Sequence, residues 1–204
     1  MRPPGTSRLR TRLAGLPPTF TTGQARLAAL SSRDVRSLAA DGEIYELSRG
    51  VYRQASAPET AHLDLLALCT RAPRAVVCEL SALALRELID DIPSAVHIAV
   101  PRGRHRPAIS YPPVVVAQRP PALFALGIEW FEAAPGETVP VYSAARSVVD
   151  SMRRRGRMGE SLALSALGRY VRRATPAQLG ELQSIAGELG ALNLIRPVIE
   201  AVLA

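Results

Sequence analysis

Two helix signals and a hairpin signal follow one another without a gap in residues 21–53, TTGQARLAALSSRDVRSLAADGEIYELSRGVYR, and this order limits the folds open to the chain. Thr21 and Gln24 have the spacing of a capping box, in which the threonine hydroxyl accepts a backbone N–H and the glutamine side chain bonds back. The first helix is expected to end just before Ser31 and Ser32, which offer the N-cap of a second helix. The segment therefore predicts two short helices around a tight turn.

The second helix is expected to have an apolar side and a basic side. Val35, Leu38 and Ala39 recur at helical spacing and are expected to face inward. The opposite side carries short or basic side chains, namely Arg33, Arg36, Ser37 and Ala40. A basic helix face with little bulk is suited to insertion into a DNA groove.

A β-hairpin is predicted directly after this helix. Gly42 favours the helix end, because glycine accepts the left-handed backbone conformation found there. Glu43–Leu47 and Val51–Arg53 are β-prone runs on either side of Ser48-Arg49-Gly50, where a second glycine suits the turn. Helix, turn, helix and hairpin predict a winged helix-turn-helix, with the second helix in the major groove and the wing on the DNA backbone. The alternative is a pair of ordinary amphipathic helices with a solvated basic face.

The predicted DNA-binding residues come from the second helix, the start of the first helix and the wing. They are Arg33, Arg36 and Ser37 on the second helix, Thr22 and Gln24 on the first, and Arg49, Tyr52 and Arg53 in the wing. The second-helix residues are expected to read bases, and the start of the first helix is expected to contact phosphate. Arg49 is expected to reach phosphate or the minor groove. Tyr52 is equally open to interpretation as a core residue.

Composition and charge agree with a folded protein that binds a polyanion. The chain has 204 residues, enough for one large domain or two modest ones, and its net charge is +7. All 25 basic residues are arginine, which we attribute to GC-biased codon usage, so each arginine carries less functional weight. Residues 1–56 contain nine arginines and four acids, so the predicted DNA-binding segment is itself basic.

Catalytic and metal-binding motifs are absent from the sequence. The histidines, His62, His97 and His105, are too scattered for a known ligand spacing. No zinc-protease, nucleophile-elbow, phosphate-loop or dinucleotide-binding motif occurs. Asp90-Asp91 is interpreted as an acidic loop after a helix, and the lysine that nuclease sites use is missing. We therefore predict no enzymatic activity, no catalytic residue, no cofactor and no metal.

The sequence also predicts a cytoplasmic location without membrane association. Cys69 and Cys78 lie in apolar surroundings and are expected to be buried, reduced thiols. The basic start of the chain lacks the apolar core of a signal peptide. No apolar run approaches the ~18 residues that a membrane helix needs.

The whole chain is predicted to be α+β, with an N-terminal winged helix-turn-helix followed by a small α/β domain that ends in a helical segment. The predicted domains are residues 1–56 and residues 57–204, the latter with an α/β layer over 57–142 and helices over 143–204. A helix over residues 7–16 completes the first domain. Further strands are predicted at 75–77, 95–100, 114–117, 128–131 and 139–142, and further helices at 59–70, 79–89, 143–155, 159–174, from 175 onward and at 194–203.

Two further basic clusters form a predicted secondary basic surface. They comprise Arg102, Arg104 and Arg106, and, within residues 152–175, Arg153, Arg154, Arg155, Arg157, Arg169, Arg172 and Arg173. One interpretation is a solvated charged face enriched by codon usage. The other is a second phosphate-contacting surface, or a docking site for an acidic or RNA-bearing partner.

Four stretches, in order, carry a family resemblance. They are SRGVYR (Ser48–Arg53), CELSALALREL (Cys78–Leu88), VHIAVPRGR (Val96–Arg104) and VYSAARSVVD (Val141–Asp150). Together they resemble the AbiEi antitoxin family, the antitoxin half of bacterial type IV toxin–antitoxin pairs. Their shared order is more specific than GVYR alone.

The resemblance implies two partners. One is double-stranded promoter DNA, whose inverted repeats the winged domain would bind to repress the protein's own operon. The other is a nucleotidyltransferase-like toxin that the C-terminal domain would counter, with or without a stable complex. Two alternatives stay open: a toxin-binding interaction module with a vestigial winged helix, and a DNA-binding regulator without a toxin partner.

Overall fold

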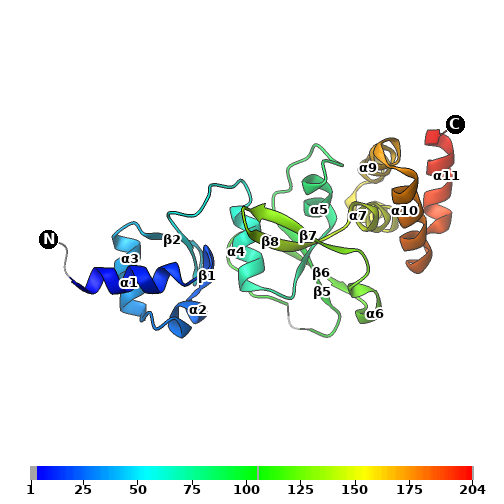
Figure 1. The fold of residues 1–204 in the computed structure, drawn as a ribbon. Helices are drawn as coiled ribbons and strands as arrows, with labels where there is room; N and C mark the ends of the chain where they lie inside the picture. The colour runs from blue at the N-terminus through cyan, green and yellow to red at the C-terminus, as the bar shows by residue number, and fades with distance from the viewer. Residues whose placement is uncertain (1–3, 105, 204) are drawn as a thin grey trace. The chain divides into compact units, whose positions relative to one another are not determined.

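The computed structural model describes residues 4–104 and 106–203, and Figure 1 shows its helices and strands. The chain forms two compact units. Unit 1 contains the residues up to Arg74 with Pro107–Pro112 and Glu132–Val139, and unit 2 contains Ala75–Arg106, Pro113–Phe131 and the residues from Pro140 onward. The predicted α+β class is confirmed. The domain boundary expected after residue 56 stays a prediction.

Unit 1 begins with the winged helix-turn-helix. Its elements are α1 (Pro4–Ala14), β1 (Thr19–Thr21), α2 (Thr22–Leu27), α3 (Ser32–Ala40), β2 (Ile44–Ser48) and β3 (Val51–Gln54). The strands form an antiparallel sheet with β3 in the middle. Strand β1 was not predicted, because its three residues become a strand only by pairing with β3. Helix α4 (Leu63–Arg71) packs against this sheet.

Hydrogen-bonded caps fix both helices of the helix-turn-helix. In the predicted capping box, the Gln24 backbone N–H donates to Thr21 Oγ1 (3.2 Å) and the Thr21 N–H donates to Gln24 Oε1 (2.7 Å). A second box caps α3, where the Asp34 N–H donates to Ser31 Oγ (3.2 Å) and the Ser31 N–H to Asp34 Oδ2 (2.8 Å). The helices enclose a core of Leu13, Phe20, Ala25, Leu30, Val35, Leu38 and Ile44.

Unit 2 is built on a mixed sheet covered by helices. Its strand order is β6-β5-β4-β8-β7, with β4 (Val76–Val77), β5 (Val96–Pro101), β6 (Val114–Arg119), β7 (Ile128–Ala134) and β8 (Glu137–Tyr142). Strand β5 runs parallel to β6 and antiparallel to β4, whereas β4 runs parallel to β8. Each of the five predicted strands is present with slightly different bounds. Residues 132–139, at the ends of β7 and β8, belong to unit 1.

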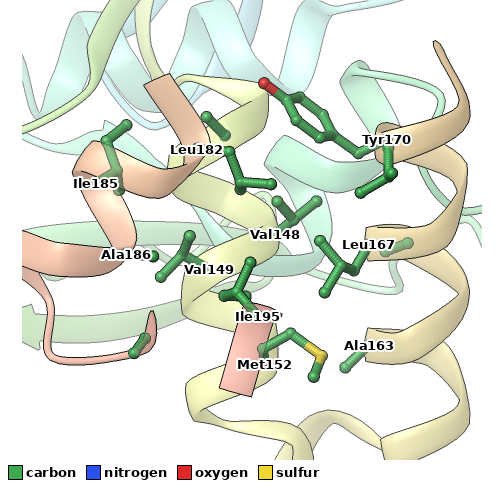
Figure 2. Packing of buried hydrophobic residues seen from close by; sticks show 14 of the residues in the cluster. Val148, Val149, Met152, Ala163, Leu167, Tyr170, Leu182, Ile185, Ala186 and Ile195 are labelled. Atoms are coloured by element: carbon green, nitrogen blue, oxygen red, sulfur yellow. The ribbon is translucent and has the colours of Figure 1, made fainter. Parts of the chain in front are cut away.

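A helical layer holds the main core of unit 2. The helices are α5 (Glu79–Leu85), α6 (Pro121–Phe124), α7 (Ala144–Arg153), α8 (Arg155–Met158), α9 (Glu160–Arg173), α10 (Pro176–Glu188) and α11 (Leu192–Leu203). Every residue of α7 from Ala145 to Met152 is buried, so this helix forms the centre of the layer. Figure 2 shows Val148 of α7 among Leu167 of α9 and Leu182 of α10.

Several helix ends differ from the prediction; the helix expected over residues 59–70, for example, begins only at Leu63. The helix expected over residues 79–89 ends at Leu85, and Glu87 beyond it adopts a left-handed φ of 55°, which no α-helix continues through. The helix expected over residues 143–155 ends at Arg153, and the short helix α8 follows.

Each unit contains one cysteine. Cys69 in α4 and Cys78 at the start of α5 are free and buried. Burial raises the pKa of Cys69 to about 12 and the pKa of Cys78 well above its ordinary value. Both thiols are therefore protonated at neutral pH. None of the described helices combines the length and apolar character needed to cross a membrane.

Candidate nucleic-acid interface

Helix α3 presents its basic side to solvent. Val35 and Leu38 are 4% and 1% exposed and anchor the helix in the core. The opposite side carries the exposed residues Arg33, Arg36, Ser37 and Ala40. Neither Arg33 nor Arg36 forms a salt bridge with a described residue. Both guanidinium groups are therefore free to bind a ligand, and the packing of Val35 and Leu38 against the core fixes the orientation of the helix that carries them.

The cap of α3 also positions this surface. Asp34 Oδ2 accepts hydrogen bonds from the Ser31 N–H and, at 2.7 Å, from Ser31 Oγ. These bonds, together with the charges of Arg12 and Arg33, lower the pKa of Asp34. The carboxylate thus stays ionised at the N-terminus of α3, where a negative charge stabilises the helix.

Thr22 and Gln24, the residues at the start of α2 that were predicted to contact phosphate, form hydrogen bonds within unit 1. The Thr22 N–H and Oγ1 both donate to the Gly50 carbonyl, at 2.9 and 3.3 Å, and so connect the helix to the wing. Gln24 Oε1 accepts from Thr21. Thr22 is half-buried and Gln24 is exposed, and their phosphate contacts stay predictions.

The wing turn places Arg49 in solvent. Gly50 adopts a φ of 74° at this turn, and its N–H donates to Glu46 Oε1 at 2.8 Å. A residue with a Cβ would be strained there, and the Cβ would lie 3.2 Å from Thr22 Oγ1. Arg49 is exposed and forms no salt bridge with a described residue.

Tyr52 and Arg53 lie on opposite faces of β3. The Tyr52 ring stacks on Phe20, with ring centroids 6.0 Å apart, and packs against the core. Burial, together with the charge of Glu46, raises the pKa of Tyr52. These contacts favour the interpretation of Tyr52 as a core residue.

Arg53 requires a correction, because it is completely buried. Its Nη1 donates to Thr19 Oγ1 at 2.6 Å and to Glu137 Oε2, and its Nη2 donates to the Pro58 carbonyl at 2.7 Å. All these partners belong to unit 1. Arg53 therefore stabilises the sheet from inside and is removed from the candidate interface.

A groove of about 860 Å³ joins the wing to parts of unit 1 outside the winged helix. Its lining includes Thr22 and Gly23 at the start of α2, Arg49 in the wing, Arg71 at the end of α4, and Ser110. Arg71 is exposed, and none of the described residues pairs with it in a salt bridge. It was missed in the sequence because it ends a helix with a mostly apolar pattern. Its place in the last turn of that helix was the available signal.

Residues 7–54 match the family model described as transcriptional regulator, AbiEi antitoxin. This part of the chain is similar to an AbiEi antitoxin domain. The match covers the helix-turn-helix and both strands of the wing, so the family resemblance is confirmed. That description names a transcriptional regulator, and the DNA contacts of α3 stay a prediction.

The chain also shares its fold with a solved structure, the crystal structure of RV2827C protein from Mycobacterium tuberculosis, at a TM-score of 0.58. The alignment covers 98% of this chain and 82% of that chain, with 16% sequence identity. At this identity the likeness concerns the fold alone. No curated protein matches the chain.

The predicted secondary basic surface separates into several groups. Arg169 forms a bidentate pair with Asp90, at 2.8 and 2.7 Å, and Arg173 donates to the Glu87 carbonyl. Arg155 pairs with Glu160. The remaining members are Arg102, Arg104, Arg106 and Arg172, which are exposed, and Arg153, Arg154 and Arg157, which line one hollow. His105 lies outside the described residues.

Within residues 4–104 and 106–203, no group of three or more His, Cys, Asp or Glu side chains could hold a metal ion. A buried charged cluster is present in unit 2 instead. It consists of Glu79, His97, Arg119, Arg146, Asp150 and Arg154. The sequence did not reveal this cluster, because its members lie in separate elements up to 75 positions apart.

Proposed function

We propose that the protein is an antitoxin that represses its own operon by binding inverted-repeat promoter DNA, and that it counters a nucleotidyltransferase-like toxin. The observation that carries the DNA-binding part is the exposed, unpaired pair of arginines on α3, opposite Val35 and Leu38. The AbiEi match of residues 7–54 supports the regulatory role.

In this proposal α3 enters the major groove and Arg33 and Arg36 contact base edges. An arginine bonded bidentately to guanine contributes about 1–3 kcal/mol of discrimination between sequences. Ser37 and Ala40 are short, so the backbone of α3 can approach the bases closely. Thr22 and Gln24 would position the helix on the phosphates.

Arg49 and Arg71 extend the proposed interface along the groove beside the wing. Both side chains are exposed and line the same groove within unit 1. Two arginines in one groove suit consecutive phosphates of a duplex backbone, where each contact adds affinity without reading sequence.

The test compares promoter and random duplexes by fluorescence anisotropy at several salt concentrations. Replacing Arg36→Ala should weaken promoter binding roughly 5- to 150-fold and random binding much less, because the lost contact reads a base. Replacing Arg49→Ala or Arg71→Ala should weaken both duplexes alike and reduce the salt slope by about 1.

Arg196→Ala is the matched control, since Arg196 is an exposed arginine of α11 in unit 2. Equal losses on both duplexes for Arg36→Ala would show that this residue touches only phosphate. A wild-type protein without preference for its own promoter would refute autoregulation. Co-expression with the neighbouring gene product tests the antitoxin role, because an antitoxin should restore growth that the toxin arrests.

A further inference from the structure

A hollow of about 270 Å³ in unit 2 is lined by Arg153, Arg154 and Arg157, at the corner between α7 and α8. We propose that it is a binding site for a phosphate group, carried either by a free nucleotide or by a nucleic-acid strand. Its volume lies just below the usual range of small-molecule pockets, about 300–1,000 Å³, which suits one phosphate group better than a large ligand.

One of the three arginines is held in a fixed position. Arg154 Nη1 donates to Glu79 Oε1 at 2.9 Å, and the same oxygen accepts from the buried Arg119 Nη2 at 2.9 Å. The other carboxylate oxygen lies 3.3 Å from His97 Nδ1. A guanidinium positioned in advance loses less entropy when it binds an anion.

Backbone strain at Glu79 agrees with this arrangement. Glu79 adopts a φ of 49°, a left-handed conformation that is unusual for a residue other than glycine. Such a residue persists only where its surroundings hold it, and these positions concentrate at functional sites. Here the conformation directs the carboxylate between Arg119 and Arg154.

The charges around the hollow leave an excess that an anion would neutralise. Three arginines of the buried cluster, Arg119, Arg146 and Arg154, share two acids, Glu79 and Asp150. Arg119 is 2% exposed, and its Nε and Nη1 have no hydrogen-bond partner among the described residues. Burial, together with the charge of Arg119, lowers the pKa of Arg154. The negative charge of a phosphate beside Arg154 would raise this pKa again.

A solvated charged face is the alternative explanation of the same arginines, and what separates them from other arginines is that Arg153, Arg154 and Arg157 share one hollow. Two half-buried arginines in this part of the chain pair with surface acids, Arg155 with Glu160 and Arg169 with Asp90, whereas the exposed Arg172 forms no salt bridge with a described residue. Arg157 has no such acid among the described residues, and the nearest acid to Arg153 is the buried Asp150, at 3.8 Å. Arginine suits phosphate because its planar guanidinium bonds two oxygens at once.

Calorimetric titration of the full-length protein tests the site, with inorganic phosphate as the probe at constant ionic strength. Replacing Arg157→Ala should weaken phosphate binding roughly tenfold or more. Arg157 is exposed and unpaired, so this variant keeps its fold. The Arg196→Ala control, which removes an equal charge, should bind as the wild type does.

Three outcomes would overturn the proposal: wild-type binding of phosphate no stronger than of chloride, unchanged binding by Arg157→Ala, or an equal loss in Arg196→Ala. ATP and a short single-stranded RNA without a terminal phosphate form the second arm. Tighter binding of ATP assigns a free nucleotide, and tighter binding of RNA assigns a strand. The variant with both Arg33→Ala and Arg36→Ala should still bind phosphate, so this test is independent of promoter binding.

Discussion

Replacing Arg53→Met tests whether this arginine belongs to the core of unit 1 or to its DNA-binding surface. Methionine has a similar length but lacks donors, so Thr19 Oγ1, the Pro58 carbonyl and Glu137 lose their bonds to the guanidinium. Glu137 is 10% exposed at its side chain and would remain as a buried charge without its partner.

The expected loss follows from these contacts. Removing one partner of a buried ion pair costs about 3–5 kcal/mol, because the other charge stays uncompensated. The three bonds act on one group and are not additive, so we expect a loss within that range. Since domains are stable by only about 5–15 kcal/mol, this is a large fraction of the total.

Urea unfolding measures the change, and hydrogen exchange of the β1 and β3 amides assigns it to unit 1. A second replacement, Glu137→Gln, in the Arg53→Met protein should recover part of the loss by removing the unpaired charge. A loss below about 1 kcal/mol, the level of an exposed pair, would contradict the core assignment. That result, together with a large loss of promoter affinity in folded protein, would restore Arg53 to the interface.

Two further replacements test the caps and the buried charges. Ser31→Ala should destabilise α3 by about 1 kcal/mol and increase the exchange of its first amides, because the Asp34 N–H loses its acceptor; unchanged exchange would show that tertiary packing alone holds this helix end. Burial acts to raise the pKa of Glu79, but hydrogen bonds from His97 and Arg119 lower it from 4.5 to about 2. The ionised carboxylate therefore stabilises the fold above about pH 4.5, and this stabilisation is lost as the pH falls toward 2. Glu79→Gln should be about 3–5 kcal/mol less stable at pH 7 and should lack this acid-dependent slope in urea unfolding, whereas a parallel slope would place the titration elsewhere.

The winged helix was predictable because its signals are local. Capping residues at Thr21 and Ser31 and the glycine at residue 50 act through bonds to near neighbours, and the structure contains those bonds. Helical spacing alone placed Val35 and Leu38 on the core side of α3, but the expectation for Ala39 was wrong, because that residue is exposed. Neither inference required knowledge of distant parts of the chain.

The orientation of β3 was not predictable in the same way. Tyr52 and Arg53 are adjacent, so they face opposite sides of the sheet, and both sides are covered: Tyr52 stacks on Phe20, and Arg53 is fully buried. From the sequence alone, an arginine is also expected to be exposed unless the partners that compensate its charge are known. Glu137, which compensates its charge, lies 84 positions further along the chain.

Two further features were not predicted for the same reason, namely the place of Arg71 in the groove and the charged cluster of unit 2. Arg71 joins the groove beside the wing because α4 packs on the sheet, and the charged cluster of unit 2 gathers residues from several elements. The spacing of residues within one helix or strand does not predict such contacts between different helices and strands.

The cysteines give this chain a built-in pair of reporters. Only the ionised sulfur attacks an alkylating reagent, and both sulfurs are buried and protonated, so alkylation of the native protein requires a local opening event. Cys69 reports on unit 1 and Cys78 on unit 2. A single labelling time course, resolved by peptide mass, therefore measures the opening of the two units separately, without any engineered probe.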